Sequence, residues 1–301
     1  NVTNASLKNT YNVAVGAYAG MDITTGERNI LIGGFAGDDL TTGADNVAIG
    51  YNAIGGVTTG SYNIAIGRHT GNVLTSGNSQ VLIGYEAGDA LTTGSRNVAI
   101  GHQALSAEDE HGRNVAVGFM SLNALNAGAD SYNTAVGYNA GGAITTGSAN
   151  TILGGLSGDA LTTGGSNVAI GYGSLSAEDT GRKNVAVGYR ALNVQNSDTD
   201  NYNVAVGYDA GLNVTTGTHN VIMGGLAGDA LTTGIQNVAI GYLALSTEDT
   251  GSKSVAIGTA ALSAQNYDGH AFNTAIGHDA GAAVTTGVEN TLIGGLAGDA
   301  L

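Results

Sequence analysis

The chain has 301 residues, with 51 Gly and no Pro, Cys or Trp, and only 11% of its residues are charged. The formal net charge of −15 disfavours binding to nucleic acid or to an anionic membrane surface, and the lack of Cys excludes disulfides and thiolate ligands. No stretch approaches 18 consecutive apolar residues, so membrane insertion is not expected.

An internal repeat starts near the N-terminus and dominates the sequence. Its marker is the first residue of an N-V-A-I-G-like motif, here called offset 0, which recurs 17 times and is Asn in 15 of the 17 coils. The spacing is 17 residues, or 19 at three places, so that Asn63, Asn133, Asn203 and Asn273 lie 70 residues apart. We therefore expect an incomplete coil at residues 1–11 and a single array from 12 to 301. From residue 63 the array consists of 70-residue blocks of four coils, and we expect it to be truncated at the C-terminus.

Within a coil, apolar residues occupy offsets +1, +2, +3, +7 and +11, and Gly stands at +4 and +14. Short β-branched runs bounded by Gly are typical of short strands separated by tight turns. The pattern predicts two or three strands of three to five residues in each coil, pairing in parallel with the next coil roughly 4.8 Å away. The predicted fold is an all-β parallel β-solenoid, or β-roll, of about 17 coils.

Stacking of the coils would align identical side chains in columns. The Asn residues at offset 0 are expected to form a structural ladder, each side-chain amide bonding to the copies above and below; its members include Asn133, Asn150, Asn167, Asn184, Asn203, Asn220, Asn237 and Asn273. The Tyr residues at +5 are expected to form a stacked, half-buried aromatic row, with a carbohydrate-binding platform as the alternative; they include Tyr138, Tyr172, Tyr189, Tyr208 and Tyr242.

The residues at offset +2 suggest that one chain alone cannot bury both faces of its strands. In a strand, +1 and +3 share one face and +2 takes the other, yet all three positions are apolar, as in strands that are buried on both faces. Most coils carry Ala at +2, and the periodic large residues there are predicted to line an axis shared between chains: Leu31, Leu82, Ile152, Ile222 and Leu292. We expect a parallel homotrimer. The alternative is a flattened coil in which +2 faces the coil's own opposite side.

Two segments carry a resemblance to known fibres. Asn133-Thr-Ala-Val-Gly-Tyr-Asn-Ala-Gly and Asn237-Val-Ala-Ile-Gly-Tyr-Leu-Ala-Leu resemble the N-T-A-I-G-Y-x-A-L-x-x-x-T-T-G repeats of phage tail-fibre shafts. The V-A-I-G core is also similar, more distantly, to the head repeats of trimeric autotransporter adhesins. The resemblance covers residues 12 to 301 and implies a trimeric fibre whose receptor-binding tip lies in another region.

The sequence contains no set of residues that matches a known catalytic arrangement. No Gly-rich phosphate-binding motif is present, and the six His residues have no partner at metal-ligand spacing: His69, His102, His111, His219, His270 and His278. Acidic runs recur at Glu108-Asp109-Glu110, Glu178-Asp179 and Glu248-Asp249, and we interpret them as solvated turns, with a Ca²⁺ site as the alternative. The chain is not predicted to be an enzyme or to hold a cofactor or metal.

The favoured function is a structural or adhesive fibre segment that forms a stiff rod outside the cell, on the cell surface or on a virion, as in a phage tail-fibre shaft or a surface adhesin. Its expected partners are copies of itself and, through regions not in this chain, a cell-surface glycan or receptor. One alternative is a self-polymerising filament subunit. Another is an ice-binding solenoid, suggested by Thr pairs such as Thr92-Thr93, although the acidic turns interrupt the Thr rows.

Overall fold

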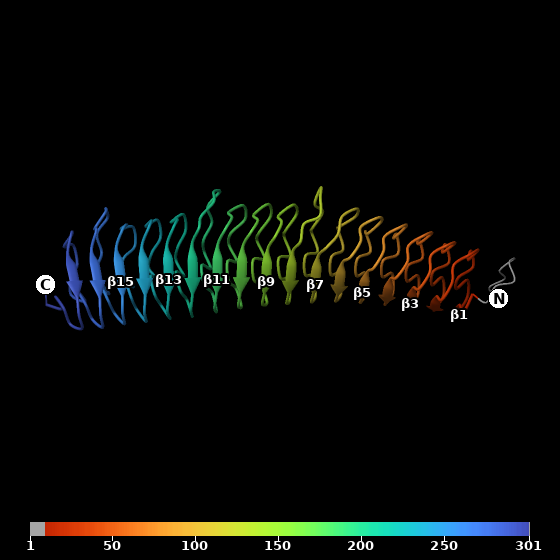
Figure 1. Ribbon diagram of the computed structural model, residues 1–301, viewed down its shortest axis with the longest axis horizontal. Helices are drawn as coiled ribbons and strands as arrows, with labels where there is room; N and C mark the ends of the chain where they lie inside the picture. The colour runs from red at the N-terminus through yellow and green to blue at the C-terminus, as the bar shows by residue number, and fades with distance from the viewer. Residues whose placement is uncertain (1–9, 301) are drawn as a thin grey trace. The chain divides into compact units, whose positions relative to one another are not determined.

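Each coil contributes one three-residue β-strand at offsets +1 to +3, and turns make up the rest of the coil (Figure 1). The computed structural model describes residues 10–300, so residues 1–9 of the expected incomplete coil and Leu301 at the end of the array lie outside the described residues. Contacts divide the chain into two units, Asn1–Ala149 and Asn150–Leu301. Both are parallel β-solenoids, as predicted.

The strands fall at the predicted offsets throughout. Unit 1 contains β1 Val13–Val15, β2 Ile30–Ile32, β3 Val47–Ile49, β4 Ile64–Ile66, β5 Val81–Ile83, β6 Val98–Ile100, β7 Val115–Val117 and β8 Thr134–Val136. Unit 2 contains β9 Thr151–Leu153, β10 Val168–Ile170, β11 Val185–Val187, β12 Val204–Val206, β13 Val221–Met223, β14 Val238–Ile240, β15 Val255–Ile257, β16 Thr274–Ile276 and β17 Thr291–Ile293.

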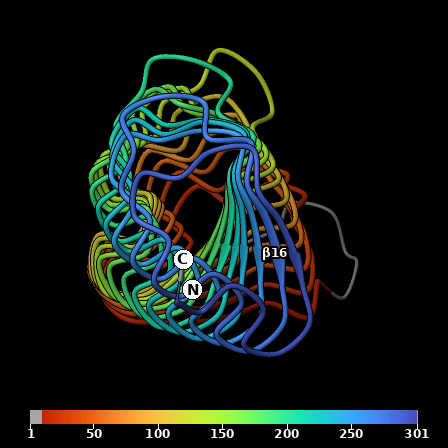
Figure 2. The same cartoon turned by 90° about the vertical axis from the view of Figure 1, so that its left-hand side faces the viewer.

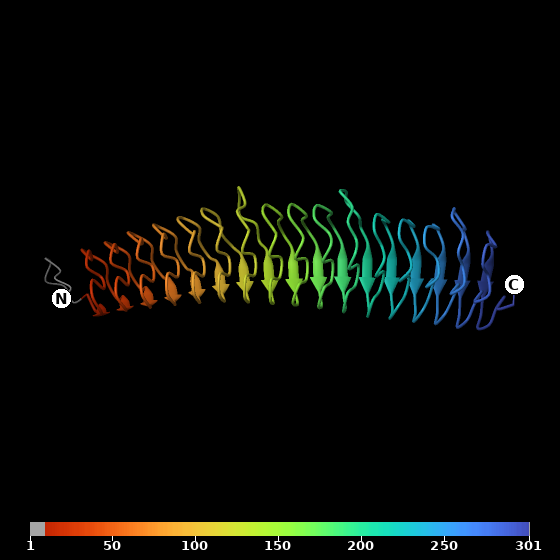
Figure 3. The ribbon, with the colours of Figure 1, turned by 180° about the vertical axis from the view of Figure 1, so that it is seen from behind.

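Within each unit, successive strands pair in parallel and in strict register, and all their arrows point the same way (Figure 3). Val168 pairs with Val185, for example, and Ala169 with Ala186. The expectation of two or three strands per coil is wrong. After the strand, Gly at +4 adopts φ values such as +140° at Gly101, which only Gly tolerates readily, and turns the chain out of the extended conformation.

Seen along the stack, the coils of each unit follow one another as successive loops with the strand on one side (Figure 2). The backbone of the turns also bonds to neighbouring coils, as where the Gly71 N–H donates to the Ala87 carbonyl at 3.0 Å. In two of the three 19-residue coils, the extra residues fall in the segments 126–132 and 196–202, which rise above the coils beside them (Figure 3).

The core of each coil consists of the side chains at 0, +2, +7, +8 and +11. Position +8 is either a buried Leu or Ile, such as Leu105, or a Gly. Where +2 is large, +8 of the same coil and of the preceding coil is Gly. A Cβ on Gly71 would lie 2.8 Å from Leu82 Cδ1, and a Cβ on Gly88 would lie 2.9 Å from Leu82 Cδ2. One large side chain thus fills the space left by two glycines.

This packing corrects the prediction of an axis shared between chains. Leu31, Leu82, Ile152 and Ile222 are completely buried within the single chain, and Leu292, in the last described coil, is partly buried. The side chains at +2 therefore point into their own coil, as in the alternative of a flattened coil. The physical reason is that the glycines at +8 leave room for them inside.

From Asn29 to Asn273 the Asn residues at offset 0 are buried, and they bond mainly to the backbone. Asn167 Nδ2 donates to the Gly181 carbonyl of its own coil at 3.0 Å, and its Oδ1 accepts the backbone N–H of Asn184 in the next coil at 3.0 Å. The same two bonds recur at Asn220 and, with a longer side chain, at Gln80. In most 17-residue coils the Asn thus closes the coil and joins it to the next, instead of bonding chiefly to other Asn side chains as expected. Asn184, which begins a 19-residue coil, makes only the second of these bonds, because its Nδ2 has no hydrogen-bond partner among the described residues.

Candidate interaction surface

The side chains at +1 and +3 point away from the coil interior, because neighbouring residues of a strand face opposite sides. The strands show the corresponding burial pattern, with the middle residue buried and the outer two partly exposed, as at Val168–Ile170. Every residue at +1 and +3 of the 17 strands is Val, Ile, Leu, Met or Thr, so none of them carries a charge. We call these two columns the outward face.

The outward face is large. The strict parallel register aligns its columns along the nine strands of unit 2. At roughly 4.8 Å per strand, this face is about 40 Å long in unit 2 alone. Isolated apolar residues are normal on a surface, but contiguous patches larger than a few hundred Å² indicate interaction sites.

The Tyr residues at +5 follow the strands and form short stacks. The rings of Tyr172 and Tyr189 are 5.7 Å apart, and those of Tyr189 and Tyr208 are 5.4 Å apart with an interplanar angle of 7°. Tyr138 stacks on Phe119 at 5.4 Å, and Tyr242 lies over Gly225. The rings are about half exposed. Within a stack, each inner ring face lies against a neighbouring ring, which does not favour a platform that presents ring faces to a sugar.

A second row, just before offset 0, was not anticipated from the sequence. Lys183 Nζ lies 4.8 Å from the centre of the Tyr202 ring, which stacks on His219 at 5.3 Å. Lys253 lies over Phe272 in the same way, at 5.3 Å. The signal is present in the repeat alignment, since a cation directly before each 19-residue coil is followed by an aromatic residue directly before the next coil.

The Glu that opens each acidic run is not solvated as interpreted, whereas the acidic residues after it are partly or fully exposed. Glu108, Glu178 and Glu248 are completely buried, and they stand at +11, where most coils place Leu, Ile or Val. Burial raises the pKa of the Glu178 carboxyl, while hydrogen bonds from Gly181, Gln195 and Ser197 oppose that rise. Alignment of the coils by offset indicates this burial, because the Glu residues occupy a position that is apolar in most coils.

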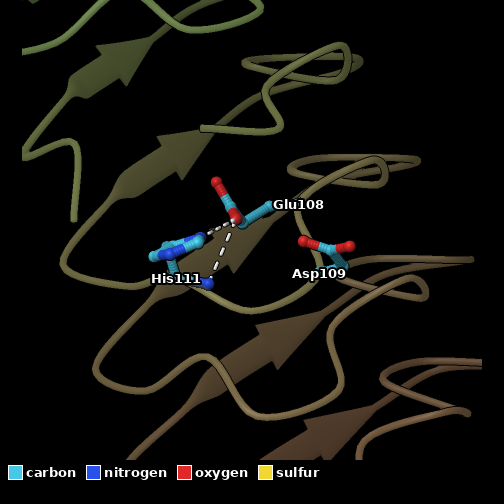
Figure 4. Close-up of side chains that lie close together, drawn as sticks. All are labelled: Glu108, Asp109 and His111. Atoms are coloured by element: carbon cyan, nitrogen blue, oxygen red, sulfur yellow. Dashed lines mark hydrogen bonds and ion pairs between the residues drawn. The ribbon is translucent and has the colours of Figure 1, made fainter. Parts of the chain in front are cut away.

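One of these turns gathers three potential metal ligands. Ligand atoms of Glu108, Asp109 and His111 lie within 4.8 Å of one another (Figure 4). His111 thus has two carboxylate neighbours that the spacing of the His residues did not indicate.

A further set of acidic side chains lies at +9. One carboxylate oxygen of each of Asp89, Asp159 and Asp229 is buried and has no hydrogen-bond partner. Burial raises the pKa of all three carboxyls. They lie in the coils with a large residue at +2, so they recur every 70 residues.

Comparison with known proteins found no matching family model, no matching curated protein and no matching solved structure. Among the residues that the structure describes, no helix has the length and apolar character needed to cross a membrane.

Proposed function

We propose that the chain is a structural or adhesive fibre segment that assembles with copies of itself into a parallel homotrimer through the outward face. The observation that carries the proposal is the complete lack of charge at +1 and +3 in a chain with a net charge of −15. A surface that faced only water would be free to accept charged residues at these positions.

The available area supports self-association. If the neighbouring +5 row is included, the outward face of unit 2 covers roughly 600–800 Å² by strand dimensions. A standard protein–protein interface buries about 800 Å² on each partner. Because identical chains in parallel present identical columns at the same height, cyclic symmetry could pack these faces around one axis.

The context of the fibre follows from the resemblance of the repeats. Phage tail-fibre shafts and trimeric adhesin heads are exposed on a virion or on a cell surface, and we propose the same location for this chain. The number of three chains also follows from that resemblance.

Analytical ultracentrifugation of the whole chain tests the assembly. We expect a species of three chain masses that persists on dilution. Val204→Lys combined with Val221→Lys places charges in the middle of the outward face of unit 2 and should give a monomer with an unchanged circular dichroism spectrum. Thr216→Lys, at an exposed position outside the strand, is the matched control and should remain trimeric. A monomeric wild-type chain, or a double variant that still assembles, would contradict the proposal.

A further inference from the structure

The three acidic turns are copies of one structure in which a buried carboxylate is held by N–H donors. Glu178 accepts bonds from Gly181 N at 2.8 Å, Gln195 Nε2 at 3.0 Å, Ser197 N at 3.3 Å and Asn201 Nδ2 at 3.0 Å. Its charge is therefore compensated by donors from the chain itself.

Glu248 is held in a similar way. It accepts bonds from Gly251 N at 2.7 Å and Gln265 Nε2 at 2.9 Å, with Tyr267 N at 3.3 Å. In both turns of unit 2, a Gln at +11 of the following coil supplies a side-chain donor.

The turn at Glu108 has lost these side-chain donors. Leu125 stands where the other two blocks have Gln, and Ser131 stands where Asn201 stands and donates instead to Asn114 Oδ1 at 2.7 Å. Among the described residues, Glu108 accepts hydrogen bonds only from His111 N at 3.2 Å and Ala127 N at 3.4 Å. A completely buried carboxylate is thus held by two long bonds.

The same turn has gained a nitrogen ligand. His111 occupies +14, where the other two turns have Gly181 and Gly251. Its Nδ1 lies 3.7 Å from Glu108 Oε1, which is too far for a hydrogen bond. This nitrogen is inaccessible to solvent and has no hydrogen-bond partner within residues 10–300. Figure 4 shows the imidazole and the Glu108 carboxylate side by side, with Asp109 on the other side of Glu108.

We propose that Glu108, Asp109 and His111 form a binding site for a divalent transition-metal ion of the Zn²⁺ type. Two ligands that each lie about 2.1 Å from a tetrahedral Zn²⁺ are about 3.4 Å apart, close to the separation of His111 Nδ1 and Glu108 Oε1. One imidazole nitrogen with two carboxylates suits Zn²⁺, whereas Ca²⁺ and Mg²⁺ take oxygen ligands. The His111 side chain is 27% exposed although its Nδ1 is not, so the ion reaches the site from solvent when this ring turns aside, and water then serves as its fourth ligand.

Isothermal titration of the whole chain with ZnCl₂ tests the site. We expect one Zn²⁺ to bind per chain, and His111→Gly to lower the affinity at least tenfold. This variant installs the residue found in the two equivalent turns, so its fold should be retained, as circular dichroism would verify. Asp109→Asn should also weaken binding, while it keeps the oxygen that accepts the Glu110 N–H.

The matched control is His278→Ala. His278 Nδ1 lies 2.9 Å from Asp279 Oδ2 in an exposed pair, so this variant removes a surface His–carboxylate pair and should still bind Zn²⁺. The proposal is overturned if the chain binds no Zn²⁺, if His111→Gly and Asp109→Asn both bind like the wild type, or if Ca²⁺ binds as tightly as Zn²⁺.

Discussion

Leu82 lies directly against Gly88 of its own coil: a Cβ on that glycine would be 2.9 Å from Leu82 Cδ2. Position +8 does not require glycine for its backbone, because Leu105 occupies the same offset with φ of 53°. The glycine is there because the large side chain at +2 occupies its space, together with Leu91 at +11, whose Cδ1 would lie 2.7 Å from the same Cβ.

The first prediction is that these two positions are energetically coupled. Leu82→Ala should lower the free energy of unfolding by about 2–5 kcal/mol, because it opens a cavity. Gly88→Leu alone should also destabilise by overpacking. The double variant recreates the Ala99 and Leu105 pair of the next coil and should lose less stability than the two single changes added together. A double-mutant cycle by chemical denaturation measures this, and simple additivity would argue against the coupling.

The second prediction concerns Asn167. Asn167→Ala leaves the Gly181 carbonyl and the Asn184 N–H without their partners, and each buried unpaired group costs about 1–3 kcal/mol. We expect a loss of about 2–5 kcal/mol and faster hydrogen exchange at the Asn184 amide. Asn167→Gln is the control, because Gln80 makes both bonds at the same offset. Equal exchange rates in the Ala variant and the wild type would contradict this role.

The third prediction is a dependence of stability on pH. The folded chain raises the pKa of Asp159 and Asp229, so the folded state holds these protons more tightly than the unfolded state. Their contribution to stability is complete below the unfolded pKa of about 4 and is lost as the pH rises through the folded pKa. The melting temperature should therefore fall as the pH rises through this window.

Asp159→Asn combined with Asp229→Asn should reduce that fall and raise the melting temperature at neutral pH. The exposed Glu289→Gln serves as the control for a change in net charge. If the double variant and the wild type have the same pH profile, the buried carboxylates are not its cause.

The fourth prediction concerns the aromatic row. Tyr189→Ala removes the middle ring of the stack with Tyr172 and Tyr208 and should cost about 1 kcal/mol beyond the loss of buried area. Tyr189→Phe keeps the ring and should be close to neutral. Thermal unfolding followed by circular dichroism compares the two variants, and a Phe variant as unstable as the Ala variant would point to the hydroxyl instead.

The coil length, the strand positions and the parallel pairing could all be predicted from the sequence, because β-branched triplets bounded by Gly recur at fixed offsets. The direction in which the strands face could not, since Val168, Ala169 and Ile170 are all apolar and periodicity alone does not indicate the inner side. The alternation of side chains along a strand does indicate the inner side. Asn167 and Ala169 lie two residues apart and share a face, and the Asn167 amide closes the coil from within.

The burial of the acidic residues was not predicted, for a different reason. Glu178 was interpreted from its charge, which favours solvent, and its donors Gln195 and Asn201 are distant in sequence. Its offset of +11, shared with Leu161 in the preceding coil, was the better guide to burial. The cluster at His111 was missed because His residues were judged by their spacing from one another and not by their acidic neighbours.

The matching of large +2 side chains to glycines at +8 also bears on how such a chain folds correctly. Nearly identical repeats can mispair during folding when one coil loops out and its neighbours join. If the coil that contains Gly71 looped out, Leu82 would meet Ile54 at the preceding +8 position instead of a glycine, and the two side chains would compete for one volume. The order of the coil types along the chain thus disfavours pairing between the wrong coils, because their core side chains would clash. This holds even where the strands themselves could pair equally well.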